Sequence, residues 1–99
     1  MSVPAFQLHR EMPGTLGVSG VLSFDTAAAA LQAIGAALVA APVTRLDLAG
    51  IERADSAGLA CVLAAQAEAR RLGRELVVEN MPAGMRALAQ VCEVEALVG

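Results

Sequence analysis

Asp55 lies between a strand-like pattern and a helix-forming run that begins directly after it. The strand-like segment covers residues 43–48, where apolar and polar side chains alternate, and the alanine-rich segment covers about residues 57–72. Asp and Ser are favoured at a helix N-terminus, because a side-chain oxygen there accepts a hydrogen bond from the second or third helical N–H. The tetrapeptide Asp55-Ser56-Ala57-Gly58 therefore predicts a helix start that presents one hydroxyl on an exposed turn.

This turn supports two interpretations that are compatible with each other. In the first, Asp55 or Ser56 only caps the helix. In the second, the positive end of the helix dipole and its unpaired N–H groups favour an added phosphate or an acceptor group of a partner. The four residues alone do not decide between these interpretations.

Strand-like and helix-like segments alternate along the chain. The expected strands cover residues 6–10 and 15–19, on either side of a Pro13-Gly14 turn, and then 43–48 and 75–79. The expected helices cover residues 27–41, with Asp25 and Thr26 as capping residues, then 57–72, closed by Gly73, and a third segment after Pro82. Strands joined through a helix in one sheet are parallel, with right-handed crossovers. We therefore expect an α/β fold with a mixed, mostly parallel sheet, the order β-β-α-β-α-β-α, and one domain over residues 1–99.

The first half of the helix expected over 57–72 is apolar on every side, since residues 59–65 include no polar side chain. One face of a helix is enough to cover a sheet, so some of these residues must face another helix or solvent. The run is compatible with a binding surface beside Ser56 and with a helix that is simply buried. Similarly, the apolar triplet 76–78 is typical of a strand that is at least partly covered on both faces.

Composition excludes several classes of partner. The formal net charge is −3 and the only aromatic residues are Phe6 and Phe24, whereas nucleic-acid binding needs a basic surface and often aromatic platforms. The apolar stretch 27–43 is rich in alanine and is interrupted by Gln32, Gly35 and Pro42, which makes it too weak for a membrane span. The first residues show no export signal, so we expect a cytoplasmic protein.

Residues that could carry chemistry are sparse. Cys61 and Cys92 fall on apolar helix positions without a metal-ligand pattern, so we expect buried thiols. A hydrolase would pair Ser56 with the single histidine, His9, but neither G-x-S-x-G nor an oxyanion segment is present. Nucleotide-binding glycine motifs are also lacking. We therefore expect no enzyme activity, no cofactor and no metal.

One basic cluster, Arg70, Arg71 and Arg74, closes the helix expected over 57–72. Cations are favoured at a helix C-terminus, so we interpret it as a solvated helix end in preference to a contact with anionic lipid or a partner.

Three segments together resemble the STAS-domain family. They are Leu46-Asp47-Leu48-Ala49-Gly50-Ile51, then Ala54-Asp55-Ser56-Ala57-Gly58-Leu59 with its alanine-rich helix, and the strand Leu76-Val77-Val78. Within that family the chain looks most like the MlaB group, because Phe24-Asp25-Thr26 follows Gly20-Val21-Leu22 and Asn80-Met81-Pro82 precedes the last helix. A serine at position 56 is also what a phosphorylated anti-sigma-factor antagonist would carry.

The resemblance implies a non-catalytic protein that docks onto the MlaF-like ATPase subunit of a phospholipid-transport ABC transporter. This transporter also contains a permease, and it maintains outer-membrane lipid asymmetry in Gram-negative bacteria. Such a protein would be held at the inner membrane only through the complex. The implied partner-binding residues are Asp55, Ser56, Ala57, Gly58, Leu59 and Val62. The alternative is an anti-sigma-factor antagonist whose partner, a kinase-like anti-sigma factor, phosphorylates Ser56 and thereby abolishes binding.

Overall fold

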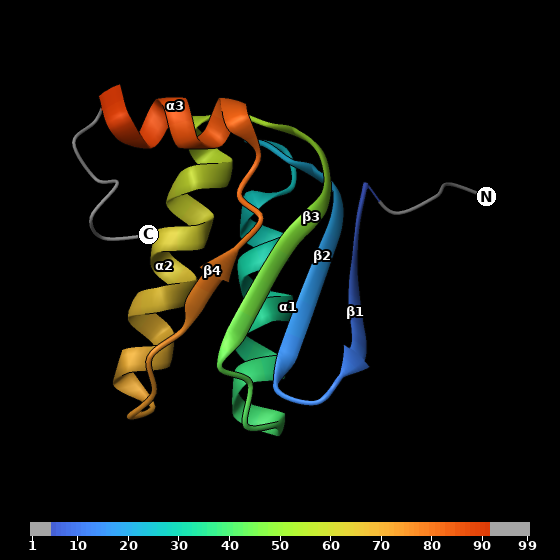
Figure 1. Ribbon diagram of the computed structural model, residues 1–99, viewed down its shortest axis with the longest axis vertical. Helices are drawn as coiled ribbons and strands as arrows, with labels where there is room; N and C mark the ends of the chain where they lie inside the picture. Colours follow the sequence, from blue (N-terminus) through green and yellow to red (C-terminus); the bar gives the residue numbers. More distant parts are fainter. Residues whose placement is uncertain (1–4, 92–99) are drawn as a thin grey trace.

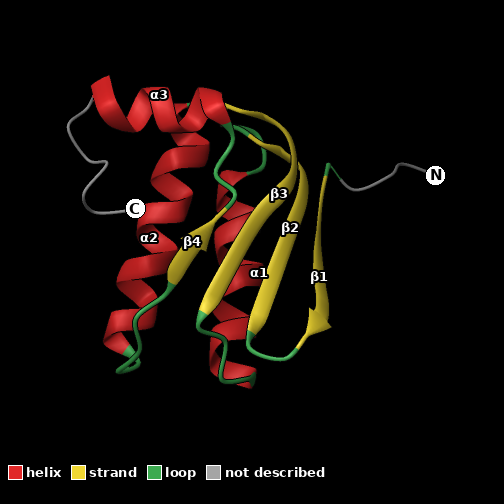
Figure 2. Ribbon diagram, viewed as in Figure 1, coloured by secondary structure: helices red, strands yellow, loops and turns green. Residues whose placement is uncertain are grey.

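The computed structural model describes residues 5–91, which form one sheet with two helices packed on one of its faces and a third helix across its end (Figures 1 and 2). The strand and helix order is the expected one. The elements are β1 (Phe6–Met12), β2 (Thr15–Leu22), α1 (Ala27–Ala40), β3 (Arg45–Ala54), α2 (Ser56–Arg71), β4 (Val77–Glu79) and α3 (Ala83–Val91).

The sheet has the order β1-β2-β3-β4, in which β1 and β2 are antiparallel and the other two pairs are parallel. Helices α1 and α2 form the crossovers between the parallel strands. The carboxyl ends of β2, β3 and β4 therefore share one edge of the sheet, where α1 and α2 also begin (Figure 1). Ligands and partners of such sheets usually meet the loops at this edge.

The core lies between the sheet and the pair α1 and α2. On β3, Leu46 and Leu48 are fully buried whereas Arg45 is exposed, which confirms the predicted alternation. On α1, Ile34 and Leu38 are fully buried. Ala27 and Leu31, at helical spacing before them, are partly buried and pack against the same core.

All four strands differ from their predicted extents: β1 and β2 start as predicted but end at Met12 and Leu22. β3 was expected to end at residue 48 but continues to Ala54, because its second half pairs with β2 as far as Leu22. β4 spans only three residues, and Val77 is 52% exposed. The expectation that this strand is at least partly covered on both faces is met on the side of Val78, which packs against the core, and not on the side of the half-exposed Val77, because α1 and α2 both pack on the same face of the sheet. Within residues 5–91 no helix covers the opposite face.

The loop between β2 and α1 is fixed by Thr26. Its hydroxyl donates to the Val21 carbonyl, with 2.9 Å between the oxygens, and accepts the Ser23 N–H at 2.9 Å. Thr26 occupies the N-cap position of α1, but its side chain makes no capping bond. The predicted capping of α1 by Asp25 and Thr26 is therefore wrong, because the carbonyl of a neighbouring strand takes the Thr26 hydroxyl.

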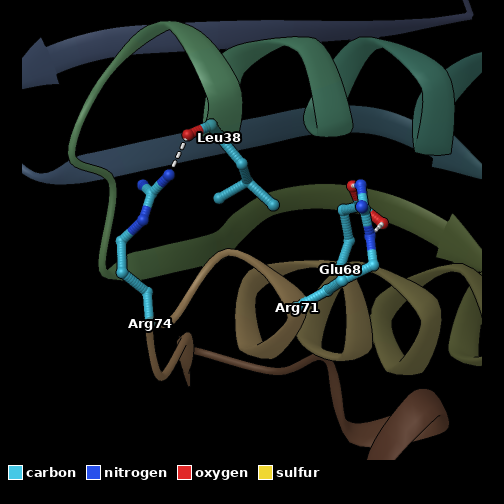
Figure 3. A network of polar contacts seen from close by, with 4 residues as sticks. All are labelled: Leu38, Glu68, Arg71 and Arg74. Atoms are coloured by element: carbon cyan, nitrogen blue, oxygen red, sulfur yellow. Dashed lines mark hydrogen bonds and ion pairs between the residues drawn. The ribbon is translucent and has the colours of Figure 1, made fainter.

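Arg74 follows α2 at the edge of the sheet opposite the carboxyl ends of β2, β3 and β4, and its guanidinium contacts the Leu38 carbonyl (Figure 3). Pro42 has no N–H to give to the Leu38 carbonyl, which would be its helical acceptor. The Arg74 guanidinium donates to that carbonyl instead, and also to the carbonyls of Ala41 at 2.8 Å and Val43 at 3.2 Å. Arg74 therefore joins the end of α1 to the loop after α2.

The predicted basic cluster is thus not a free cationic surface. Arg71 pairs with Glu68, with 3.1 Å between Nε and the carboxylate, which leaves Arg70 as the exposed member without an ion pair in the described residues (Figure 3). The following Gly73 has a φ of 80°, which confirms the predicted left-handed helix end. None of the helices in residues 5–91 is long and apolar enough to span a bilayer.

Candidate functional site

Asp55 organises the start of α2. One carboxylate oxygen accepts the N–H groups of Ala57 at 2.9 Å and Gly58 at 3.2 Å, and the Asp55 carbonyl accepts the Leu59 N–H at 3.1 Å. The other carboxylate oxygen accepts the N–H of Phe24 at 3.1 Å. Of the two residues considered as caps, Asp55 is the N-cap, and it also holds the loop between β2 and α1 against the start of α2.

These bonds hold the Asp55 carboxylate in its charged form. The Phe24 N–H lowers the pKa of Asp55 most, and the N–H groups of Gly58 and Ala57 lower it further. Three N–H groups at the start of α2 already have acceptors within the chain, contrary to the expectation of unpaired donors. An incoming phosphate would have to displace the Asp55 carboxylate to reach them.

Ser56, the first residue of α2, is exposed. In the part of the chain that the structure describes, its hydroxyl has no hydrogen-bond partner. The sequence-based prediction of an outward hydroxyl at this turn is therefore confirmed. Its role in partner binding stays a prediction.

The other predicted contact residues divide between core and surface. Leu59 is 4% exposed and Val62 is fully buried, so neither offers its side chain to a partner. The expectation that they supply apolar contacts is corrected, because the helical period places both on the side of α2 that faces the core. Gly58 is also buried, and a Cβ on it would lie 2.3 Å from the Leu22 carbonyl oxygen. Gly58 therefore permits the close approach of α2 to β2.

An apolar groove between α1 and α2 begins directly beside Ser56. Its volume is about 320 Å³, and its lining residues are Ala27, Ala28, Leu31, Ala57, Ala60, Cys61 and Ala64. Among them Ala60 is exposed, whereas Cys61 is only 3% exposed and burial raises the pKa of its thiol. The apolar surplus of α2 is thus explained by two surfaces, one in the core and one in this groove. Cys92, the other cysteine, lies outside the described residues.

Phe24 is a second surface feature that the sequence reasoning did not assign to the site. It is 83% exposed, although it is one of only two aromatic residues in the chain. Its backbone N–H is held by Asp55, so the loop that carries the ring is tied to the Ser56 turn. One sequence signal could have identified Phe24 as a site residue: it is an aromatic residue between a strand and a helix in a chain with only two aromatics.

Within residues 5–91, Ser56 and the single histidine lie on different elements and do not contact each other. His9 lies on β1, and its Nε2 is 2.7 Å from the Ser19 hydroxyl oxygen on β2, so the Ser56–His9 pairing considered for a hydrolase is not observed. Asp47 accepts the Ala49 N–H and the Asn80 side-chain amide, which lower its pKa. The described residues contain no cluster of three His, Cys, Asp or Glu side chains that could hold a metal.

Solved structures show the same fold in anti-sigma-factor antagonists. The unphosphorylated form of the anti-sigma factor antagonist SpoIIAA has a TM-score of 0.71 at 21% identity, over 96% of this chain and 86% of that one. The phosphorylated form of the Bacillus cell fate determinant SpoIIAA has a TM-score of 0.67 at 22% identity, over 96% and 89%. An anti-sigma factor antagonist from Mycobacterium paratuberculosis has a TM-score of 0.72 at 24% identity, over 99% and 87%.

Sequence comparison places the chain in a family. A search of curated protein sequences finds no significant match. The family model described as "Mlab, STAS domain" matches residues 7–99, which includes all three helices and all four strands apart from the first residue of β1. The chain therefore belongs to the STAS-domain family, and the branch of that family that it matches is the one named for Mlab.

Proposed function

We propose that this protein is a non-catalytic cytoplasmic subunit that binds the ATPase of a phospholipid-transport ABC transporter and supports its assembly and activity. Its role would be the maintenance of outer-membrane lipid asymmetry, and it would reach the inner membrane only through the ATPase and the permease. The observation that carries the proposal is the Ser56 hydroxyl, exposed and unpaired within residues 5–91, beside an apolar groove. The match to the Mlab family model supports it.

The geometry of the turn suits binding without chemistry. Ser56 is exposed and is followed by Ala57, whose short side chain lines the groove, so a partner can approach the start of α2 closely. Asp55 holds this turn in one conformation through its bonds to the loop before α1 and to the first turn of α2. A rigid surface that binds one conformation of an ATPase better than another shifts the ATPase toward that conformation by its differential affinity alone.

Co-purification with the ATPase tests this proposal. We expect Ser56→Glu to lose the ATPase, because the larger charged side chain prevents close approach and is left unpaired in the interface. The control is Thr44→Glu, which adds the same charge at an exposed position before β3, at the opposite edge of the sheet, and should bind as the wild type does. Retention of the ATPase by Ser56→Glu at the wild-type level would contradict the proposal.

A second candidate is an anti-sigma-factor antagonist controlled by phosphorylation of Ser56. Two observations favour it: the exposed hydroxyl, which a kinase can reach, and the shared fold with SpoIIAA, whose phosphorylated form has been solved. A phosphate on Ser56 would lie beside the Asp55 carboxylate, whose bonds already occupy the nearby N–H groups. The added charge would be repelled there and would change the surface that a partner meets.

Phosphorylation separates the two candidates. Incubation with ATP and a kinase-like anti-sigma factor, followed by mass spectrometry of the Ser56 peptide, should show no added phosphate for a transporter subunit. Stoichiometric phosphate on Ser56, with loss of binding to that kinase, would favour the antagonist.

A further inference from the structure

The groove between α1 and α2 has the dimensions of a site for one short helix. On α2 its lining residues recur at Ala57, Ala60, Cys61 and Ala64, which is one helical stripe of about two turns and about 11 Å. On α1 the stripe runs from Ala27 to Leu31. Alanine side chains on both walls allow a third helix to pack at about 8 Å between axes, with the larger aliphatic side chains supplied by the partner.

The two helices that form the groove begin at the same edge of the sheet (Figure 1). Phe24 and Asp25 come just before α1 and Ser56 is the first residue of α2, so these three exposed residues lie at this end. We propose that the groove receives an amphipathic helix of the partner, that Phe24 anchors it, and that this helix carries a basic side chain facing Asp25 and Asp55. This inference rests on the proposed function, in which the partner is the ATPase, and it specifies the chemistry of the surface that the ATPase must present.

The charged residues beside the groove indicate which kind of partner helix binds there. Phe24, Asp25, Arg53 and Asp55 are among the residues that line one hollow, which therefore has two carboxylates and one guanidinium. The two ion pairs in the described residues are Arg45–Glu79 and Arg71–Glu68, and neither neutralises this hollow. A partner helix with a Lys or Arg at this end would complement the excess negative charge. A second copy of this chain is disfavoured, because a two-fold dimer would bring the same carboxylates together.

Phe24 has the properties of a binding anchor. Its ring is 83% exposed, so a partner that covers it removes a large apolar area from water. The Asp55 carboxylate holds the Phe24 N–H at 3.1 Å, and the buried Thr26 fixes the same loop by its bonds to Val21 and Ser23. A ring on a loop already fixed in this way loses little conformational freedom on binding, which favours affinity. Aromatic residues, Phe included, are enriched in protein–protein interfaces.

Calorimetric titration of the purified ATPase tests this surface. Phe24→Ala and Ala60→Gln should each weaken binding by about 30-fold or more, since the first removes the anchor and the second fills the groove. The control is Val39→Ala, which removes another exposed apolar side chain from the far end of α1 and should change affinity by less than about twofold. Asp25→Asn should make the affinity less dependent on salt. Thermal melts establish that each variant is folded.

The outcomes distinguish this inference from the proposed function. If Ser56→Glu abolishes ATPase binding while Phe24→Ala and Ala60→Gln bind like the wild type, the docking surface is wrong and the proposed function stands. If the wild-type protein does not bind the ATPase, both are wrong. If sedimentation shows a dimer that Phe24→Ala dissociates, the groove is occupied by a second copy and the inference is overturned.

Discussion

Arg74 gives the most direct test of how the fold is held at the edge opposite Ser56. Its guanidinium bonds to the carbonyls of Leu38, Ala41 and Val43, and the first of these has no helical donor because residue 42 is proline. Hydrogen bonds to a charged group contribute about 1.5–3 kcal/mol each, but these three share one partly exposed side chain and are not additive. We therefore expect Arg74→Ala to lower the free energy of unfolding by about 2 kcal/mol.

Thermal and urea unfolding measure this change. For a domain of this size a loss of about 2 kcal/mol corresponds to a decrease in Tm of about 8–16 °C. Arg74→Lys should lie between Arg74→Ala and the wild type, because an ammonium group cannot direct a planar fork at three carbonyls. Arg70→Ala removes an exposed guanidinium from the same helix end and should stay within about 0.5 kcal/mol of the wild type. If Arg74→Ala is as stable as Arg70→Ala, the capping role assigned to Arg74 is wrong.

Three further predictions concern the site and its supports. Gly58→Ala should lower the free energy of unfolding by about 1–3 kcal/mol in urea titration, because the added Cβ would lie 2.3 Å from the Leu22 carbonyl oxygen. The control is Gly35→Ala, whose added Cβ has no atom within 4 Å and which should stabilise α1 by about 0.5–1 kcal/mol. Equal effects of the two substitutions would contradict this account. Because the pKa of Asp55 is lowered in the folded protein, its charged carboxylate stabilises the fold above the usual aspartate pKa, and this contribution is lost as the pH falls through the pKa of the folded state. The difference in unfolding free energy between the wild type and Asp55→Asn should therefore shrink from about pH 6 to about pH 3. A constant difference would exclude a charged cap. Burial raises the pKa of the Cys61 thiol, so it should react with iodoacetamide much more slowly in the folded protein than in urea. Peptide mass spectrometry measures both rates, and equal rates would refute the burial of Cys61.

The order of elements could be predicted because each local signal agrees with the final fold. The alternation around Leu46 and Leu48 identifies the helix-facing side of β3, and Gly73 marks the end of α2. The extents of β3 and β4 could not be predicted in the same way. The second half of β3 is a strand because of its pairing with β2, and this pairing depends on partners distant in sequence.

Contacts between distant side chains and backbone were also beyond the sequence signals. Arg74 bonds to a carbonyl 36 residues away, and only the missing N–H of Pro42 indicates that such a donor is needed. Thr26 was predicted to cap α1, but the carbonyl of Val21 takes its hydroxyl. The acceptor of Arg74 is brought near only by the tertiary fold, whereas the acceptor of Thr26 lies five residues before it and depends on how the loop after β2 turns.

The candidate site was predictable at its centre and not at its borders. The strand-to-helix junction was sufficient to predict the cap at Asp55 and the exposed Ser56, because both depend on the geometry of one helix start. The burial of Leu59 and Val62 depends on which side of α2 meets the core. The groove and the exposure of Phe24 depend on how α1 and α2 lie beside each other, so they emerge only from the packed structure.

Amide hydrogen exchange of the protein with and without the ATPase tests the central claim, that partner binding occurs at the Ser56 turn and its groove. The account predicts slower exchange on binding in peptides that cover residues 23–31 and 55–64, and no change in peptides from β1 or from the exposed start of β3. Protection confined to the open face of the sheet, with no change at residues 55–64, would contradict it.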